Sequence, residues 1–173
     1  MARITVNTTG TQPVLLVSTE ISTSANIANG IFANTSNALS VTCLQDVTLT
    51  NSTGVFSWTD FCSTDINKVS TPADNEVSTN IVIDDEVYFG NSSASTGSAK
   101  NLGVAGLSQT KTQIQWKLVW DNSSANGNVS NAYYTSGVGF ISSLAPTVSP
   151  EAPVWVTPMS IAVNGQMYNG QNS

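Results

Sequence analysis

Histidine is absent from this chain, and charged residues are few. The chain has 173 residues and no histidine, which excludes catalytic dyads that use imidazole, histidine zinc sites and the side chain that most often moves protons near neutral pH. Only 9% of its residues are charged, against roughly 25% in an average soluble domain. G-x-G-x-x-G and Walker sequences are also absent, so no motif is present to hold a nucleotide. We therefore expect neither an enzyme nor a bound cofactor or metal ion.

Basic residues are too scarce for tight binding of nucleic acid. Lysine and arginine number 5 against 11 aspartates and glutamates, which gives a formal net charge of −6. A protein that clamps a phosphate backbone needs a basic stripe. The negative charge fits instead a surface past which DNA slides without sticking, because like charges repel.

Cysteines and long apolar runs are also few. The two cysteines, Cys43 and Cys62, do not make a disulfide-rich scaffold. They either pair across adjacent strands or serve as two small buried hydrophobic side chains, and the second interpretation is favoured. The N-terminus has no apolar run and nowhere do about 18 consecutive apolar residues occur, so we expect no signal peptide and no membrane span.

Serine, threonine and asparagine supply most of the polarity. Thr, Val, Ile and aromatic residues suit strands, Ser, Asn and Gly suit turns, and strong helix formers are scarce. Together with the turn signals between short strands, this composition predicts an all-β fold, an antiparallel β-sandwich or flattened barrel. We expect a single domain over residues 1–173 with no internal repeat.

Apolar and polar residues alternate in several segments, which predicts strands. Those segments are 38–43, 47–50, 55–59, 77–83, 114–120, 132–141 and 154–163, with a further short apolar run at 14–17. Apart from that run, residues 1–30 are expected to form an extended arm, and residues 60–76 a loop. Residues 102–111 are the one helix candidate, interrupted by Gly103 and Gly106. Asn164-Gly165 is expected to turn the C-terminal tail back.

The clearest strand also predicts the core. Residues 114–120 place Ile114, Trp116, Leu118 and Trp120 on one face, and the strand after it aligns Tyr134, Val138 and Phe140. Large aromatic side chains bury about 150–250 Å² each. We therefore expect Trp116, Trp120 and Phe140 to be core aromatic residues.

Three groups of residues resemble catalytic or metal sites without meeting their requirements. Cys62 stands near Asp60 and Asp65, whose negative charge disfavours a thiolate. Ser108-x-x-Lys111 matches an acyl-enzyme motif, but the companion motifs are missing. The run 84–86 has three carboxylates without the spacing of a calcium loop. In an extended strand, successive side chains point to opposite faces, so the run is expected to be a solvated strand end.

Two stretches resemble the tail-tube (major tail) proteins of long-tailed bacteriophages. VTLTNSTGVFSWTDFCSTDINKVSTPADNEVSTNIVI, residues 47–83, has an outgoing strand, a polar segment and a returning strand, similar to the long hairpin of that family. NAYYTSGVGFISSLAPTVSPEAPVWVTPMSIAVNGQ, residues 131–166, resembles the C-terminal half of the family. The helix between them departs from the family, which usually has a firmer one, and this leaves the register of 90–112 open.

The resemblance implies a virion structural protein with one short flanking helix and a long hairpin. In that family six subunits form a ring around a channel for DNA, and stacked rings contact one another through the hairpin and terminal arms. Inter-ring contact candidates are then Asp60, Asp65, Asn67 and Lys68. The implied partners are other copies of the chain, in stacked homohexameric rings, and other phage tail proteins. The resemblance further implies that viral DNA passes without specific binding, that no membrane is involved, and that the protein belongs to the virion after synthesis in the host bacterial cytoplasm.

Two alternatives share this composition. One is another phage structural component, such as a head decoration protein or a fibre-associated β-sandwich, which binds capsids instead of stacking on itself. The other is a carbohydrate-binding β-sandwich, in which Trp58, Tyr133 and Trp155 form an exposed aromatic platform.

Overall fold

The computed structural model describes residues 13–59, 65–120, 132–147, 151 and 154–172. Cys62 and Asp60 lie outside these residues, as does the Asn126-Gly127 pair after residues 114–120, whose sequence predicts a chain reversal. The described elements, in chain order, are β1 (Val14–Ser18), α1 (Ser24–Ala28), β2 (Leu39–Val41), β3 (Leu44–Thr59), β4 (Ile66–Val82), the π-helix η1 (Asp85–Phe89), α2 (Ala99–Thr110), β5 (Ile114–Val119), β6 (Tyr133–Leu144), β7 (Val156–Val163) and β8 (Tyr168–Gln171).

All eight strands belong to one antiparallel sheet, which confirms the all-β prediction. The strand order is β2-β1-β5-β6-β7-β4-β3, and β8 pairs with β6. The edge strands β2 and β3 follow one another in the chain, separated by only two residues. The sheet is therefore an open one that folds over toward itself. Three short helices occur in the described residues, where one was predicted.

The main core lies between the folded sheet and α2. Strands β1, β2, β4, β5, β6 and β7 all contribute buried side chains to it. Trp116 is fully buried there and Trp120 packs against its margin. The indole N–H of Trp120 donates to Thr135 Oγ1 at 3.0 Å, so this ring is half-buried with its polar group satisfied. Trp116 is therefore a core residue, whereas Trp120 lies at the edge of the core.

Phe140 is not a core residue, because 41% of its surface is exposed. It does share a face of β6 with Tyr134, as the alternation predicts. That face is opposite the one carrying Ile141, which belongs to the main core. Near Tyr134 the face is covered, since Ser136 and Tyr134 donate to carbonyl groups at the end of α1. The described elements leave the position of Phe140 uncovered.

The N-terminal third is more ordered than predicted. β1 lies between β2 and β5 in the sheet, and all five of its residues are buried. Helix α1 follows, with the Thr23 hydroxyl accepting from the backbone N–H of Asn26. The short strand predicted at 14–17 is therefore confirmed, whereas the prediction of an extended arm is wrong for residues 24–28, which form a helix. Residues 1–12 lie outside the described part.

The C-terminal tail does not turn back at Asn164-Gly165. β7 and β8 are both antiparallel to β6 and pair with the same strand one after the other. Val163 pairs with Gly139 and Tyr168 with Ser136, so two extra residues bulge out between the strands. Residues 164–167 therefore interrupt the pairing with β6 without reversing the direction of the chain.

Helix α2 and η1 are held together by two glycines. The predicted helix exists, but it kinks at Gly103, where φ is 63° and ψ is 178°. A side chain at Gly103 would place its Cβ 2.4 Å from the backbone nitrogen of Gly90. Only glycine allows this approach. The interruption read from the sequence is thus a packing requirement.

Cys43 is exposed, so its expected burial is wrong. It lies between β2 and β3 with φ at 61°. This left-handed conformation breaks the alternation that places Leu39 and Val41 in the core. The chain turns a corner here, and Cys43 faces away from the core.

Candidate functional site

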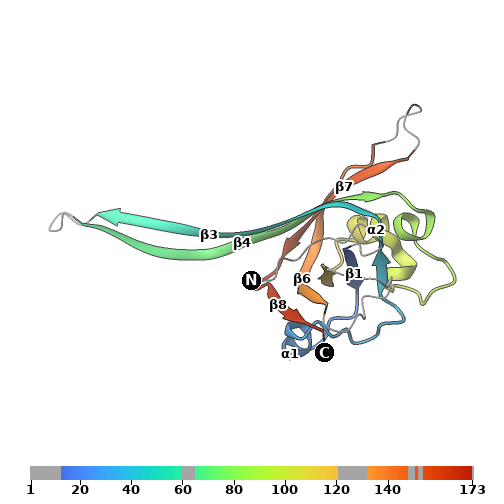
Figure 1. The fold of residues 1–173 in the computed structure, drawn as a ribbon, viewed down its shortest axis with the longest axis horizontal. Coiled ribbons are helices and arrows are strands. Elements are labelled where there is room, and N and C mark those ends of the chain that lie inside the picture. The colour runs from blue at the N-terminus through green and yellow to red at the C-terminus, as the bar shows by residue number, and fades with distance from the viewer. Residues whose placement is uncertain (1–12, 60–64, 121–131, 148–150, 152–153, 173) are drawn as a thin grey trace.

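The longest feature of the molecule is a two-stranded arm. β3 and β4 pair from Leu44–Ile81 to Thr59–Ile66, and their outer parts extend away from the rest of the sheet (Figure 1). We define the arm as residues 52–59 and 66–74, and the rest as the body. The predicted loop at 60–76 is therefore wrong from Ile66 onward, because that stretch is strand. The long hairpin implied by the family resemblance is present.

Register in the arm changes once, between Thr53 and Val55. Thr53 pairs with Ala73 and Val55 with Ser70, so β4 carries one extra residue around Pro72. Proline has no N–H to give to a ladder, which makes a bulge a favourable place for it. The bulge shifts only β4, so each face of β3 continues unbroken into the arm.

The two faces of the arm carry different side chains. Phe56 pairs with Val69 and Trp58 with Asn67; we call Phe56, Trp58 and Val69 the aromatic face. The rings of Phe56 and Trp58 are stacked, with centroids 5.9 Å apart. Across the arm, the opposite face carries Val55, Ile66 and Lys68. All five apolar side chains are exposed, by 43% to 62%.

The predicted contact residues lie near the end of this arm. Asn67 and Lys68 are exposed neighbours on β4, pairing with Trp58 and Ser57 and pointing to opposite faces. Asp65 is exposed and directly precedes β4. Asp60 lies outside the described residues. The sequence pattern did not identify the exposed aromatic pair beside them, although it did place Phe56 and Trp58 on one side.

The described elements leave a second surface of the body uncovered, the side of β3, β4, β7 and β6 that faces away from the core. We call it the open face. Its residues are Asp46, Thr48, Thr50, Glu76, Ser78, Asn80, Phe140, Pro158, Ser160 and Ala162. Hydroxyl, amide and carboxylate groups dominate the set, and none of its members is a lysine or arginine.

Polar side chains on the open face bind one another across strands. The Ser78 hydroxyl lies 3.3 Å from that of Ser160 and donates to Glu76 Oε1 at 3.2 Å. The Asp46 carboxylate accepts from the backbone and side-chain nitrogens of Asn80, both at 2.8 Å. These bonds hold two carboxylates in place, so the face is a fixed, weakly negative surface.

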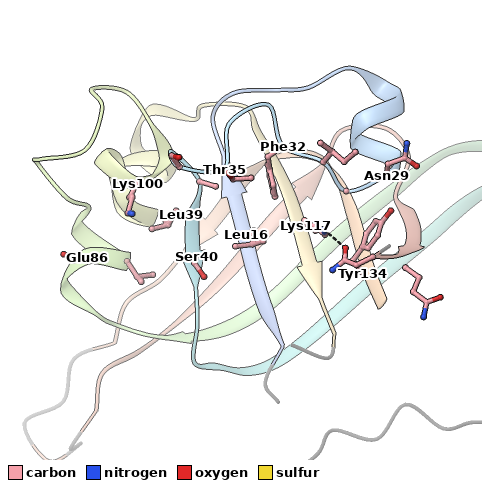
Figure 2. Close-up of a pocket in the computed structure, with 17 residues that line it drawn as sticks. Leu16, Asn29, Phe32, Thr35, Leu39, Ser40, Glu86, Lys100, Lys117 and Tyr134 are labelled. Carbon is pink, nitrogen blue, oxygen red and sulfur yellow. Dashed lines mark hydrogen bonds between the residues drawn. The ribbon is translucent and has the colours of Figure 1, made fainter. Parts of the chain in front are cut away.

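Beyond β6, the same side of the sheet forms a groove of about 1020 Å³ under α1 and the segment after it. Figure 2 shows Lys117 and Tyr134 lining it together with Leu16 and Phe32. Lys117 Nζ donates to Asn172 Oδ1 at 2.9 Å and lies 4.6 Å from the centre of the Tyr134 ring. Burial lowers the pKa of Lys117 and raises that of Tyr134. The Lys117 ammonium group thus has its partners, Asn172 and the Tyr134 ring, within the protein.

A smaller groove of about 480 Å³ lies at the start of β6. We call it the aromatic groove, and it is lined by Trp120, Tyr133, Tyr134 and residues 169–171. The Tyr134 hydroxyl donates to the Ala28 carbonyl at 3.1 Å. Both Trp120 and Tyr134 therefore have their polar groups satisfied within the protein, and Tyr134 is buried.

The three aromatic residues considered for carbohydrate binding do not form one platform. Trp58, Tyr133 and Trp155 are all exposed, by 43% to 48%. Trp58 pairs with Asn67 in the arm, whereas Trp155 precedes Val156, which pairs with Val82. At about 3.3 Å per strand residue, positions 67 and 82 are roughly 50 Å apart along β4. A single sugar-binding surface cannot include both tryptophans.

The run at 84–86 is a helix start and not a strand end, which corrects the prediction. Asp84 caps η1, because its Oδ1 accepts from the N–H groups of Glu86 and Val87. Lys111 of the S-x-x-K match caps α2 in a left-handed conformation. In the described residues no group of three or more His, Cys, Asp or Glu side chains could hold a metal ion. No helix in that part of the chain is long and apolar enough to cross a membrane.

Comparison with known proteins finds similarity in structure only. No protein-family model matches the chain, and no curated protein matches it in a sequence search. A chain of the virion of a native gene transfer agent (GTA) particle aligns with a TM-score of 0.55 and 9% identity over 96% of this chain and 99% of that one. A chain of the tail of an empty GTA particle with C6 symmetry aligns with a TM-score of 0.54 and 10% identity, covering 90% and 95%.

The SPP1 tail tube gives a third match. Its chain aligns with a TM-score of 0.54 and 13% identity over 97% of this chain and 80% of that one. All three alignments cover at least 90% of this chain. The resemblance to tail-tube proteins is therefore confirmed at the level of the fold: this chain has the fold of phage and GTA tail proteins.

Proposed function

We propose that this chain is a virion structural protein, the subunit of a tail tube that assembles into stacked rings around a channel for DNA. The observation that carries the proposal is the fold, which aligns over 97% of the chain with that of the SPP1 tail tube. The C6 symmetry of the similar GTA tail supports rings of six copies. We further propose that residues 1–173 act as one tail-tube-like domain.

The open face lines the channel in this proposal. It carries Asp46 and Glu76 among hydroxyl groups, and no cation stands among its residues. Repeated around a ring, such a face surrounds the bore with fixed negative charge, which repels phosphate. DNA then passes without specific binding.

The arm supplies contacts between rings. It extends beyond the body and has no cover from the described part of its own chain (Figure 1). Asp65, Asn67 and Lys68 are exposed near its end, in positions from which they reach a neighbouring copy. We propose these three, together with Asp60, as inter-ring contact residues.

The protein acts with other copies of itself and with other tail proteins, in the virion, after synthesis in the host cytoplasm. It performs no catalysis. Several polar side chains of its open face are hydrogen-bonded to one another, and this supports a structural surface more than a reactive site.

Self-assembly of the purified protein tests the proposal. We expect sedimentation at increasing concentration to reveal a rapidly sedimenting species, and negative-stain microscopy of that species to reveal rings or tubes with a central channel. Monodisperse monomers at high concentration would contradict the proposal. Binding to capsids without self-association would identify a head decoration protein instead.

A further inference from the structure

Lys117 is a lysine in the interior of the sheet. It lies on β5, between β1 and β6, and only 5% of its surface is exposed. Its ammonium group contacts the Asn172 side chain and the Tyr134 ring, and no carboxylate of the described residues pairs with it. A buried charge without an opposite charge is costly. Burial therefore lowers the pKa of Lys117 and favours the neutral amine, which is the nucleophilic form.

Close packing holds this amine in place. A Cβ added to Gly30 would lie 2.9 Å from Lys117 Cε and 2.8 Å from the Tyr134 ring, so the lysine side chain runs directly between the ring and the Gly30 backbone. Gly170, two residues before Asn172, packs against the Tyr134 hydroxyl group. The Tyr134 ring, which Figure 2 shows beside Lys117, therefore positions both the lysine and the strand that leads to Asn172.

The side chain of Asn172 presents a primary amide to the amine. Lys117 Nζ donates to Asn172 Oδ1 at 2.9 Å, and the backbone N–H of Asn172 donates to the Ala132 carbonyl at 2.9 Å. A C=O bond is about 1.23 Å long, so Cγ of this amide lies at most about 4.1 Å from Nζ. A small rotation about the Cβ–Cγ bond then turns Cγ toward Nζ. Groups held this close react with effective molarities on the order of 10⁵–10⁸ M.

We propose that Lys117 and Asn172 form an isopeptide bond within the chain. The lone pair of Nζ attacks Cγ of Asn172, the bond between Cγ and Nδ2 breaks, and this nitrogen leaves as ammonia. One proton of Nζ passes to the departing nitrogen, with solvent water as the carrier, through the groove that both residues line. Atoms and charges balance, and the reaction needs no oxidant or reductant. The product is a neutral secondary amide between the two side chains.

The bond is expected to form slowly. General acid–base catalysis by a positioned side chain is worth about 10²–10⁴-fold, and no described carboxylate contacts Lys117 to supply it. Freshly purified protein therefore keeps Lys117 as an amine that titrates, and the bond accumulates over days in the folded state.

The bond ties the end of the described chain to the middle of the sheet. β8 has only four residues and pairs with β6, so it is held by a short ladder. A bond between Lys117 and Asn172 closes a loop across β6, β7 and β8. From the entropy of loop closure, we expect the linked protein to melt higher than the unlinked protein by on the order of 10 °C.

Intact mass spectrometry of the denatured protein measures the bond. We expect folded protein to lose about 17 Da, the mass of ammonia, in most molecules over days of incubation. Protein incubated in guanidinium chloride is the matched control and should keep its full mass, because only the fold brings the two groups together. Folded protein that keeps its full mass for weeks overturns the proposal. A loss already complete at purification supports the bond and corrects only its rate.

Digestion with trypsin locates the bond, because Lys117 is the last lysine or arginine of the chain. A linked Lys117 blocks cleavage between 112–117 and 118–173, and chymotrypsin then leaves residues 169–173 attached to Lys117. Ammonia is also lost when an Asn-Gly pair, such as Asn164-Gly165, closes to a succinimide. In that case trypsin still cleaves after Lys117, and this result overturns the proposal.

Two variants separate a covalent bond from a hydrogen bond. Asn172→Ala removes the reacting amide. The control Asn169→Ala removes another asparagine of the same segment, whose Oδ1 accepts from Thr135 Oγ1. After circular dichroism has established that both fold, each is compared with itself before and after incubation. We expect Asn169→Ala to lose ammonia and to gain in Tm as the unmodified protein does, and Asn172→Ala to do neither. An equal mass loss in Asn172→Ala overturns the proposal, and if a variant does not fold, the mass of the unmodified protein still decides.

Discussion

The contact between Gly103 and Gly90 provides a quantitative test of how the body is held together. Gly103 adopts φ 63° and ψ 178°, a region that is essentially open to glycine alone. In Gly103→Ala, the new Cβ would lie 2.4 Å from the Gly90 nitrogen and 2.6 Å from the Tyr88 carbonyl oxygen. Both are backbone atoms, so relief of the clash requires η1 and α2 to move apart.

Two costs add in this variant. The backbone conformation costs about 1–3 kcal/mol for a residue with a side chain, and overpacking typically costs another 1–3 kcal/mol. The total is about 2–6 kcal/mol. In a chain of this size, each kcal/mol shifts Tm by about 2–4 °C, so the expected fall is on the order of 10 °C.

Gly97→Ala is the matched control. Gly97 also has a positive φ, 79°, but nothing lies within 4 Å of a Cβ added there. Only the backbone cost remains, about 1–2 kcal/mol. Thermal unfolding followed by circular dichroism compares the two variants. If Gly103→Ala melts no lower than Gly97→Ala, the packing argument is wrong.

Three further predictions concern the core, the pH dependence and the channel. Trp116→Ala is expected to lower the free energy of unfolding by about 3–5 kcal/mol, and Phe140→Ala by less than about 1 kcal/mol; urea unfolding of each variant checks this, and equal losses would contradict the placement of Phe140 outside the core. Burial lowers the pKa of Lys117 in the folded protein below its ordinary 10.5. Between the folded and the unfolded pKa the unfolded state binds more protons, so the free energy of unfolding rises with pH in that window. Urea unfolding of Lys117→Met at several pH values should lack this rise, and a pH profile equal to that of the unmodified protein would argue against the burial. Ser160→Lys should make assembled tubes retain duplex DNA, with the logarithm of the affinity falling by about 0.9 per phosphate contact for each unit of log salt concentration. The control Thr96→Lys, at an exposed position between η1 and α2, should not retain DNA. Retention by both variants, or by neither, would place Ser160 outside the bore.

The sequence predicted the strands that have one face toward the core. Residues 77–83 and 114–120 alternate because one side of each strand faces buried neighbours, and this period is visible without a structure. The outer part of β4 was missed for the same physical reason. Residues 66–74 are exposed on both faces, apart from the half-buried Thr71. No alternation of apolar and polar residues therefore marks them as a strand.

Periodicity also could not decide which face is covered. It aligned Phe140 with Tyr134 correctly, but coverage of that face by α1 ends before Phe140. Helix α1 itself has only five residues, too few to give a period of 3.6. These features depend on packing between segments distant in the chain.

The candidate site likewise has one part that the sequence predicted and another that only the structure revealed. The hairpin as a whole, with Asn67 and Lys68 near its end, followed from the family resemblance. The exposed aromatic face required the structure, because Phe56 and Trp58 on one side of a strand ordinarily indicate burial. The open face likewise required the strand order, which places β3, β4, β7 and β6 side by side.

A helical reconstruction of the assembled particle by electron microscopy tests the central claim most directly. We predict a hollow tube of stacked rings, with the open face toward the bore and the side chains of Asp46 and Glu76 lining it. A tube in which that face points outward, or protein that forms no tube under any assembly condition, would contradict the account.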